Sequence, residues 1–324
     1  MQQVQSIAPR RATSRRLWGS LTLDHLWVLT ILGLAALFIS VLPLPPNDLW
    51  WHMAAGRTMV DEGAWLQTNR WAYTLPYDAP YVYQSWLSEV LLYWLWRIGD
   101  VPLLVLMRTL VITASYGLVA WHALRRTGQG KAVALALLFA VLIGWNNWTL
   151  RPQTLALLPG AAFVVVLDAF LIRRASARWL VALPLLMVLW VNLHGSFILG
   201  AALLALAWFG SAVSTIRRPH GADHDPWRLR ALTLVGFATL LATMVHPLGV
   251  GVFPYVRDLL TDTPSQTRIV EWQPPTNAFS LTNTGFWFFL LVVLLPMLVA
   301  RGRRRATATD LLWFAALAWL TIGG

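Results

Sequence analysis

The sequence predicts an all-α polytopic membrane protein with about nine transmembrane helices and a long first outer loop. Of its 324 residues, 57% are hydrophobic and only 12% are charged. A soluble domain has roughly a quarter of its residues charged, and a disordered chain has low hydrophobicity, so both classes are excluded. The apolar residues also fall in runs of about 20, the length that crosses a bilayer.

Nine apolar segments are expected to span the membrane. They lie near residues 26–42, 101–124, 132–148, 154–172, 179–193, 198–216, 231–248, 285–300 and 311–322. Some of them are short for a hydrocarbon core of ~30 Å, which predicts tilted helices or a locally thinner bilayer.

The basic residues support this division. Eighteen of the 25 lie before the first span or in every second connection after it, namely in residues 10–16, 125–131, 173–178, 217–230 and 301–305. Cytoplasmic loops are enriched in Lys and Arg, so the pattern places the N-terminus in the cytoplasm. We therefore expect a basic cytoplasmic tail at 1–25 and a single transmembrane domain at 26–324.

The composition also limits the chemistry. The chain has no cysteine, which excludes disulfides, zinc–thiolate sites and cysteine nucleophiles. The net charge of +11 is explained by the cytoplasmic loops, so no nucleic-acid partner is expected. Polar residues collect instead in two long outer loops, 43–100 and 249–283, which points to a site on the non-cytoplasmic face.

The first outer loop is predicted to hold two membrane-parallel helices, at 49–60 and 84–97, with an ordered aromatic-rich segment between them. In the first helix, Leu49, Trp50, Met53 and Val60 are expected to be available to the membrane. In the second, Glu89 is expected to be solvated. That helix ends at Gly99 and Asp100, immediately before the second span.

Asp48 is the strongest candidate residue, since it stands where the first span leaves the membrane. It can cap the following helix, and the helix dipole would keep its carboxylate ionised. An ionised carboxylate in that position can act as a base or as an ion ligand. His52 lies one helical turn later and can share the same face.

The motifs of this loop resemble a known family. The stretch NDLWWHMAAGR from Asn47 to Arg57, with EWQP at Glu271 and NLHG at Asn192, is similar to bacterial multi-pass proteins described as GT-C-like. That fold includes protein O-mannosyltransferases and the aminoarabinose transferases of lipid A. The resemblance implies a polyprenyl-phosphate sugar donor, a catalytic role for Asp48 and location in a bacterial inner membrane. One departure is that Asp48 is followed by Leu49, where mannosyltransferases commonly have paired acidic residues.

Four further residues are candidates for substrate binding. Arg108 lies inside the second span, where an arginine is costly unless it is paired or faces a cavity. Arg151 sits at an outer turn and can hold a phosphate or a lipid headgroup. His194 lies at the outer end of the fifth span, and Glu271 lies in the last large outer loop. No cofactor is expected. Asp48 with His52, His194 or His246 has the chemistry to bind a divalent metal, but the spacing of these residues in the sequence does not define a metal site.

These observations lead to a functional hypothesis with two alternatives. The hypothesis is a glycosyltransferase that moves a sugar from a polyprenyl-phosphate donor to an extracytoplasmic lipid, glycan or protein acceptor. The first alternative is a non-catalytic lipid-binding or assembly protein. The second is a transporter or flippase, for which inverted repeats and mid-membrane charges are expected; no repeat is visible and the polar residues gather at one face.

Overall fold

The computed structural model describes residues 21–45, 48–217, 226–268, 290 and 307–323. Within these ranges the secondary structure is helical, apart from loops and one isolated β-bridge between Thr68 and Pro80. The helices are α1 (Leu23–Val41), α2 (Asp48–Glu62), α3 (Trp86–Thr127), α4 (Gly130–Gly144), η1 (Trp145–Asn147), α5 (Pro152–Leu171), η2 (Ala177–Val181), α6 (Ala182–Leu193), α7 (Phe197–Arg217), α8 (Pro226–Ala242), η3 (Gly249–Gly251), α9 (Val252–Thr261), α10 (Thr263–Arg268) and α12 (Ala308–Gly323).

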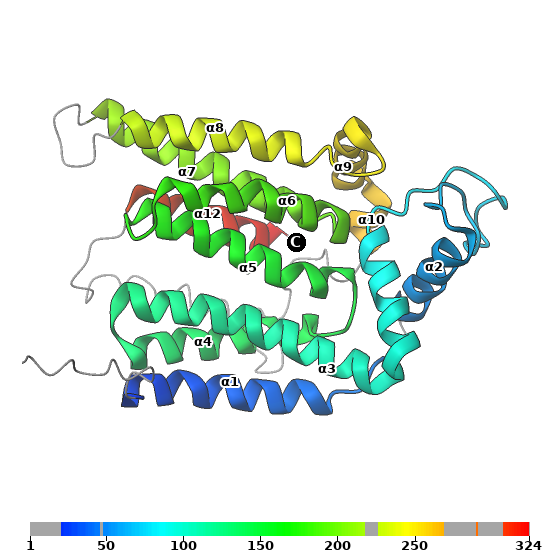
Figure 1. Ribbon diagram of the computed structural model, residues 1–324, viewed down its shortest axis with the longest axis horizontal. Coiled ribbons are helices and arrows are strands. Elements are labelled where there is room, and N and C mark those ends of the chain that lie inside the picture. Colours follow the sequence, from blue (N-terminus) through cyan, green and yellow to red (C-terminus); the bar gives the residue numbers. More distant parts are fainter. Residues whose placement is uncertain (1–20, 46–47, 218–225, 269–289, 291–306, 324) are drawn as a thin grey trace, which may run out of the picture.

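The long helices lie side by side as a bundle, and the shorter helices of the loops gather at one end of it (Figure 1). We call the end that carries α2, α9 and α10 the loop end. The opposite end, where α3 stops at Arg125 and Arg126 and α8 begins near Arg228, is called the basic end. The alternation of basic residues predicted this separation of the two kinds of connection. Which end faces the cytoplasm remains a prediction.

The surface of the bundle has the character of a membrane protein. Four helices, α1, α3, α5 and α7, are long and apolar enough to cross a bilayer, and three shorter ones are apolar as well. In α1, large side chains such as Leu34 (60% exposed) and Leu37 (63% exposed) cover the outer surface. Contiguous exposed apolar surface of this kind is unusual on soluble monomers and is expected where lipid replaces water. The all-α membrane class is therefore supported, whereas the number of nine spans stays a prediction, and the expected span at 285–300 lies almost entirely outside the described residues.

Helix α3 consists of two parts that meet at the predicted boundary. Gly99 and Asp100 have non-helical backbone angles, and Asp100 has a φ of +51°. The backbone N–H of Val101 donates a hydrogen bond of 2.8 Å to Asp100 Oδ1, and Pro102 stands in the first turn of the second part, where its missing N–H costs nothing. Residues 86–98 cross the loop end of the bundle, and residues 101–127 run along the bundle (Figure 1).

Helix α2 packs against the first part of α3 at Gly56. A Cβ atom at Gly56 would lie 2.0 Å from the carbonyl oxygen of Glu89, so only glycine permits this distance between the two backbones. Leu49 (0% exposed) and Met53 (6%) join the main core of the bundle. The expectation that these two side chains face the membrane is therefore wrong, because α2 turns that face toward protein.

The start of α3 is attached to the neighbouring turns by side chains that satisfy helix-terminal carbonyls. Gln84 Nε2 donates to the carbonyl of Val191 at 2.6 Å, and Ser88 Oγ donates to that of Leu193 at 2.7 Å. Both acceptors belong to the last turn of α6, which has no intrahelical donors of its own for them. Asn192 accepts from Trp86 Nε1 at 2.7 Å and donates to the carbonyl of Val245. The first part of α3 is thus held in a fixed position over the bundle.

Candidate functional site

Asp48 is the first residue of α2, and its carboxylate pairs with Arg151. The Asp48 Oδ2 to Arg151 Nε distance is 3.5 Å, and the side chains are 59% and 18% exposed. Arg151 is the N-cap residue of α5, so the contact joins the first outer loop to a turn nearly 100 residues later. Two residues singled out from the sequence are thereby brought together.

His52 lies one turn after Asp48 on α2 and contacts Glu89 of α3. Its Nδ1 atom is 2.9 Å from Glu89 Oε1. The Glu89 side chain is almost completely buried, with the residue 1% exposed, whereas the His52 side chain is 17% exposed. Burial raises the pKa of Glu89, and the hydrogen bond with His52 offsets part of that rise. In its ionised form Glu89 can only accept hydrogen bonds, so Nδ1 of His52 then carries the proton and Nε2 keeps its lone pair. The prediction that Glu89 is solvated is wrong.

His194 is the C-cap residue of α6 and lies near His52. Its Nδ1 accepts a hydrogen bond of 3.1 Å from the backbone N–H of Ser196. Burial, with a smaller contribution from His52, lowers the pKa of His194 to about 4. At neutral pH this ring is therefore uncharged, and its remaining nitrogen carries the proton and can act as a donor.

Aromatic residues of the first outer loop surround the His52–Glu89 contact. The ring of Trp51 lies edge-on to His52 at 4.9 Å and stacks on Tyr83 at 5.8 Å. Burial raises the pKa of Tyr81, and it raises that of Tyr83 to about 12; Glu89 adds to both shifts. Tyr83 also donates its hydroxyl hydrogen to the carbonyl of Thr68 at 3.2 Å. Both phenols stay protonated across the physiological range and supply apolar walls.

Arg108 is buried and bonds to the end of α1. Its guanidinium donates to the carbonyls of Ile39 (2.7 Å), Leu42 (2.5 Å) and Pro43 (3.1 Å). These groups belong to the C-terminal end of a helix, which lacks intrahelical donors and carries partial negative charge. The contacts account for a buried arginine in this span without a bound phosphate. Arg108 therefore makes a structural contact, and its role in substrate binding stays a prediction.

The remaining sequence candidates are less informative. Glu271 lies outside the described residues. His246, a possible metal partner of Asp48, hydrogen-bonds through Nε2 to the carbonyl of Gln84 at 3.0 Å. Over the part of the chain that the structure describes, no group of three or more His, Asp or Glu side chains lies where it could hold a metal ion.

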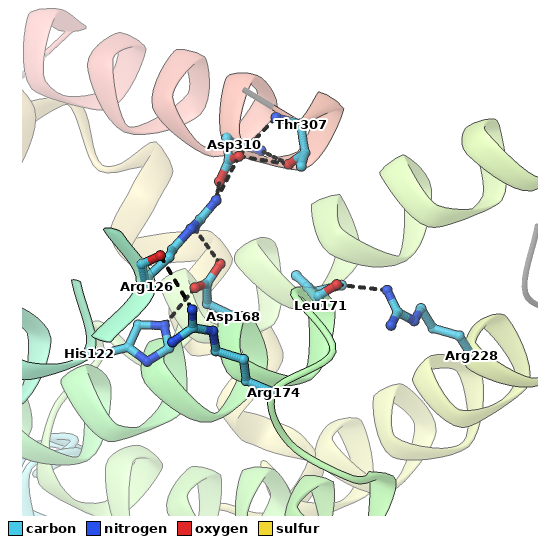
Figure 2. A network of polar contacts seen from close by, with 8 residues as sticks. All are labelled: His122, Arg126, Asp168, Leu171, Arg174, Arg228, Thr307 and Asp310. Atoms are coloured by element: carbon cyan, nitrogen blue, oxygen red, sulfur yellow. Dashed lines mark hydrogen bonds and ion pairs between the residues drawn. The ribbon is translucent and has the colours of Figure 1, made fainter. Parts of the chain in front are cut away.

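A second polar cluster lies far from these residues, at the basic end (Figure 2). Asp168 of α5 accepts from His122 at 2.6 Å and from Arg126 at 2.8 Å, both on α3. Arg126 also donates to both carboxylate oxygens of Asp310 on α12, at 2.9 Å each. The cluster joins three helices, and we regard it as structural.

The structure also contains an apolar groove of about 620 Å³ between η2, α6 and α8. Its walls include Leu180, Leu234 and Val235, and Trp227 and Arg230 also line it. These residues belong to the parts of α8 and η2 nearer the basic end, so the groove is separate from the residues around Asp48 and Glu89.

The loop end therefore combines an exposed carboxylate, a neighbouring arginine and an imidazole held by a buried carboxylate. We call Asp48, His52, Glu89, Arg151 and His194 the loop-end site. Such a set can accept a proton from a hydroxyl group and can stabilise a negative charge. Glu89 was missed from the sequence because its partner lies 37 residues away; the available signal was Gly56, one turn after His52, which allows a close helix approach.

Comparisons with protein-family models, with curated proteins and with solved structures found no match to this chain.

Proposed function

We propose that the protein is a glycosyltransferase of the inner membrane that transfers a sugar from a polyprenyl-phosphate donor to an extracytoplasmic acceptor. The observation that supports this best is the Asp48–Arg151 pair at the loop end. Transfer from a lipid phosphate needs an anionic group to receive or orient the acceptor hydroxyl and a cation to stabilise the leaving phosphate. These two groups lie 3.5 Å apart, on helix termini that join the loops to the bundle.

Each residue has a role in this proposal. Asp48 acts as general base or orients the acceptor hydroxyl, and Arg151 neutralises the phosphate as the bond to the sugar breaks. His194 donates a hydrogen bond to the substrate from its uncharged ring. Glu271 remains a proposed sugar or acceptor contact on the last outer loop. The proposed transfer is a single displacement, which inverts the anomeric centre.

The test uses the full-length protein in lipid nanodiscs. The donors are polyprenyl-phosphate mannose, glucose and aminoarabinose, each radiolabelled in the sugar, with inner membranes as the acceptor pool. We expect label to enter the acceptor fraction and polyprenyl phosphate to be released. Asp48→Asn should reduce turnover by about 10²–10⁴-fold, the usual contribution of a catalytic acid or base, without changing the unfolding temperature.

Asp61→Asn is the matched control, because Asp61 lies on the same helix, is 57% exposed and also pairs with an arginine. This variant should retain full turnover. Wild-type turnover in Asp48→Asn would contradict the assignment of Asp48, and no turnover of any donor by the wild-type protein would contradict the proposed function.

A second candidate is a non-catalytic lipid-binding or assembly protein. The observation that favours it is the apolar groove beside α8, where Arg230 stands at walls formed by Leu234 and Val235 and can pair with an anionic lipid headgroup. Binding of polyprenyl phosphate that is weakened by Arg230→Ala, without any sugar transfer in the assay above, would support this second candidate.

A further inference from the structure

The His52–Glu89 contact has no assigned role in the transfer described so far, and packing alone does not require it. Glu89 is 1% exposed, and burying a carboxylate is costly unless it is paired and hydrogen-bonded. Its Oε1 atom contacts His52, but Oε2 has no hydrogen-bond partner within the described ranges. A glutamine could fill the same space and keep a hydrogen bond to the imidazole at lower cost.

The position of helix α2 does not depend on this contact either. Gly56 fixes the distance between α2 and α3 by direct backbone approach to Glu89, and Leu49 and Met53 anchor α2 in the core. Packing therefore does not explain why a carboxylate stands at position 89. When it is ionised, this carboxylate fixes the tautomer of His52, orients the ring and stabilises the imidazolium that forms when Nε2 takes a proton.

We infer that His52 is the general base of the loop-end site, with Glu89 as its positioning residue and Asp48 as the group that orients the acceptor. This inference rests on the proposed function and deepens it. In the transfer step, the acceptor oxygen forms a bond to the anomeric carbon while its proton moves to His52 Nε2. The bond from that carbon to the phosphate oxygen breaks, and the phosphate leaves with the bonding electron pair. The proton on His52 then passes to water.

The surroundings of the contact suit this role. His52 is 17% exposed at the side chain and lies on the same helix face as Asp48, one turn away. The other titratable groups that face the contact are His194 from the end of α6, Tyr81 and Tyr83 from the first outer loop, and Tyr255 from α9. His194 is uncharged at neutral pH and the three phenols are protonated, so none of them competes with His52 for the proton in that range.

The test is chemical rescue of the full-length protein in nanodiscs, with the radiolabelled donor that the wild-type protein turns over. His52→Ala should lower kcat by about 10²–10⁴-fold. Added imidazole and its methylated derivatives should restore turnover, with rates that rise with the basicity of the added base. His52→Gln fills the site without supplying a base and should stay inactive at an unchanged unfolding temperature, which separates a chemical from a folding defect.

Glu89→Gln tests the positioning role. We expect kcat to fall roughly 100-fold or more while KM changes little, because the ring loses its charged partner and not its contact with substrate. Glu62→Gln is the matched control, because Glu62 lies on α2 with its side chain 44% exposed, and it should retain full turnover.

The outcomes separate this inference from the proposed function. If Asp48→Asn is inactive but His52→Gln and Glu89→Gln keep wild-type turnover, transfer stands and the dyad assignment is overturned. Failure of every base to rescue His52→Ala, in a variant that is folded and binds donor, also overturns it. Absence of transfer by the wild-type protein overturns both.

Discussion

Replacing Gly56 by alanine tests whether the close approach of α2 to α3 builds the loop-end site. The new Cβ would lie 2.0 Å from the carbonyl oxygen of Glu89, whereas ordinary contacts begin at 3.4 Å, so the two backbones must separate by about 1.4 Å. The same movement would lengthen the 2.9 Å contact between His52 and Glu89 to about 4 Å, beyond hydrogen-bond range. Overpacking of this kind costs roughly 1–3 kcal/mol.

Two measurements check this prediction. Thermal unfolding in nanodiscs should show a lower midpoint for Gly56→Ala, and sugar transfer should fall because the imidazole loses its partner. Gly33→Ala is the control, since no atom lies within 4 Å of its would-be Cβ and alanine favours a helix over glycine by about 1 kcal/mol. If Gly56→Ala is as stable and as active as wild type, the argument that backbone proximity holds the site is refuted.

Three further predictions concern other parts of the molecule. Arg108→Met should leave the terminal carbonyls of α1 without donors, at a cost of about 1–3 kcal/mol for each one that stays buried, measured as a lower unfolding midpoint. Asp310→Asn should weaken the bond from Arg126 to α12 by about 2 kcal/mol and accelerate amide hydrogen exchange in α12, with unchanged exchange arguing against the role of that pair. Since the folded-state pKa of His194 is about 4 and the usual value is 6.5, this residue binds more protons in the unfolded chain between these values. Its contribution to stability should therefore fall as the pH drops from about 6.5 to 4 and stay constant above that window, and His194→Asn should make the slope of unfolding midpoint against pH smaller in that window.

Much of the fold follows from local sequence. Eight of the nine expected spans coincide with described helices, because apolar runs and their charged ends are readable one segment at a time. The break in α3 was also predictable, since Gly99 and Asp100 stop one helix and Pro102 suits the start of the next. These features depend only on residues close together in the chain.

The interior of the site depends instead on distant pairings, and those were harder to predict. Glu89 lies near two serines in a helix with one polar face, a pattern that predicts a solvent-exposed side chain. In the structure α2 covers that face and buries Glu89. The hydrogen-bond partners of Arg108 could not be predicted either, because they are backbone carbonyls, which every residue has whatever its side chain. Arg151 was a candidate from its place at an outer turn, but only the tertiary structure joins it to Asp48.

The two parts of α3 are joined by Gly99 and Asp100 alone, with no intervening loop. The first part of α3, which contains Glu89, is thus attached directly to the part that we expect to cross the membrane. A membrane-spanning helix of fixed length tilts in a thinner bilayer. The first part of α3 must then rotate or strain its hydrogen bonds to α6. The acyl-chain length of the surrounding lipids should consequently alter the position of Glu89 relative to the imidazole of His52. Nanodiscs made from shorter and longer lipids should therefore give different turnover from the same purified chain.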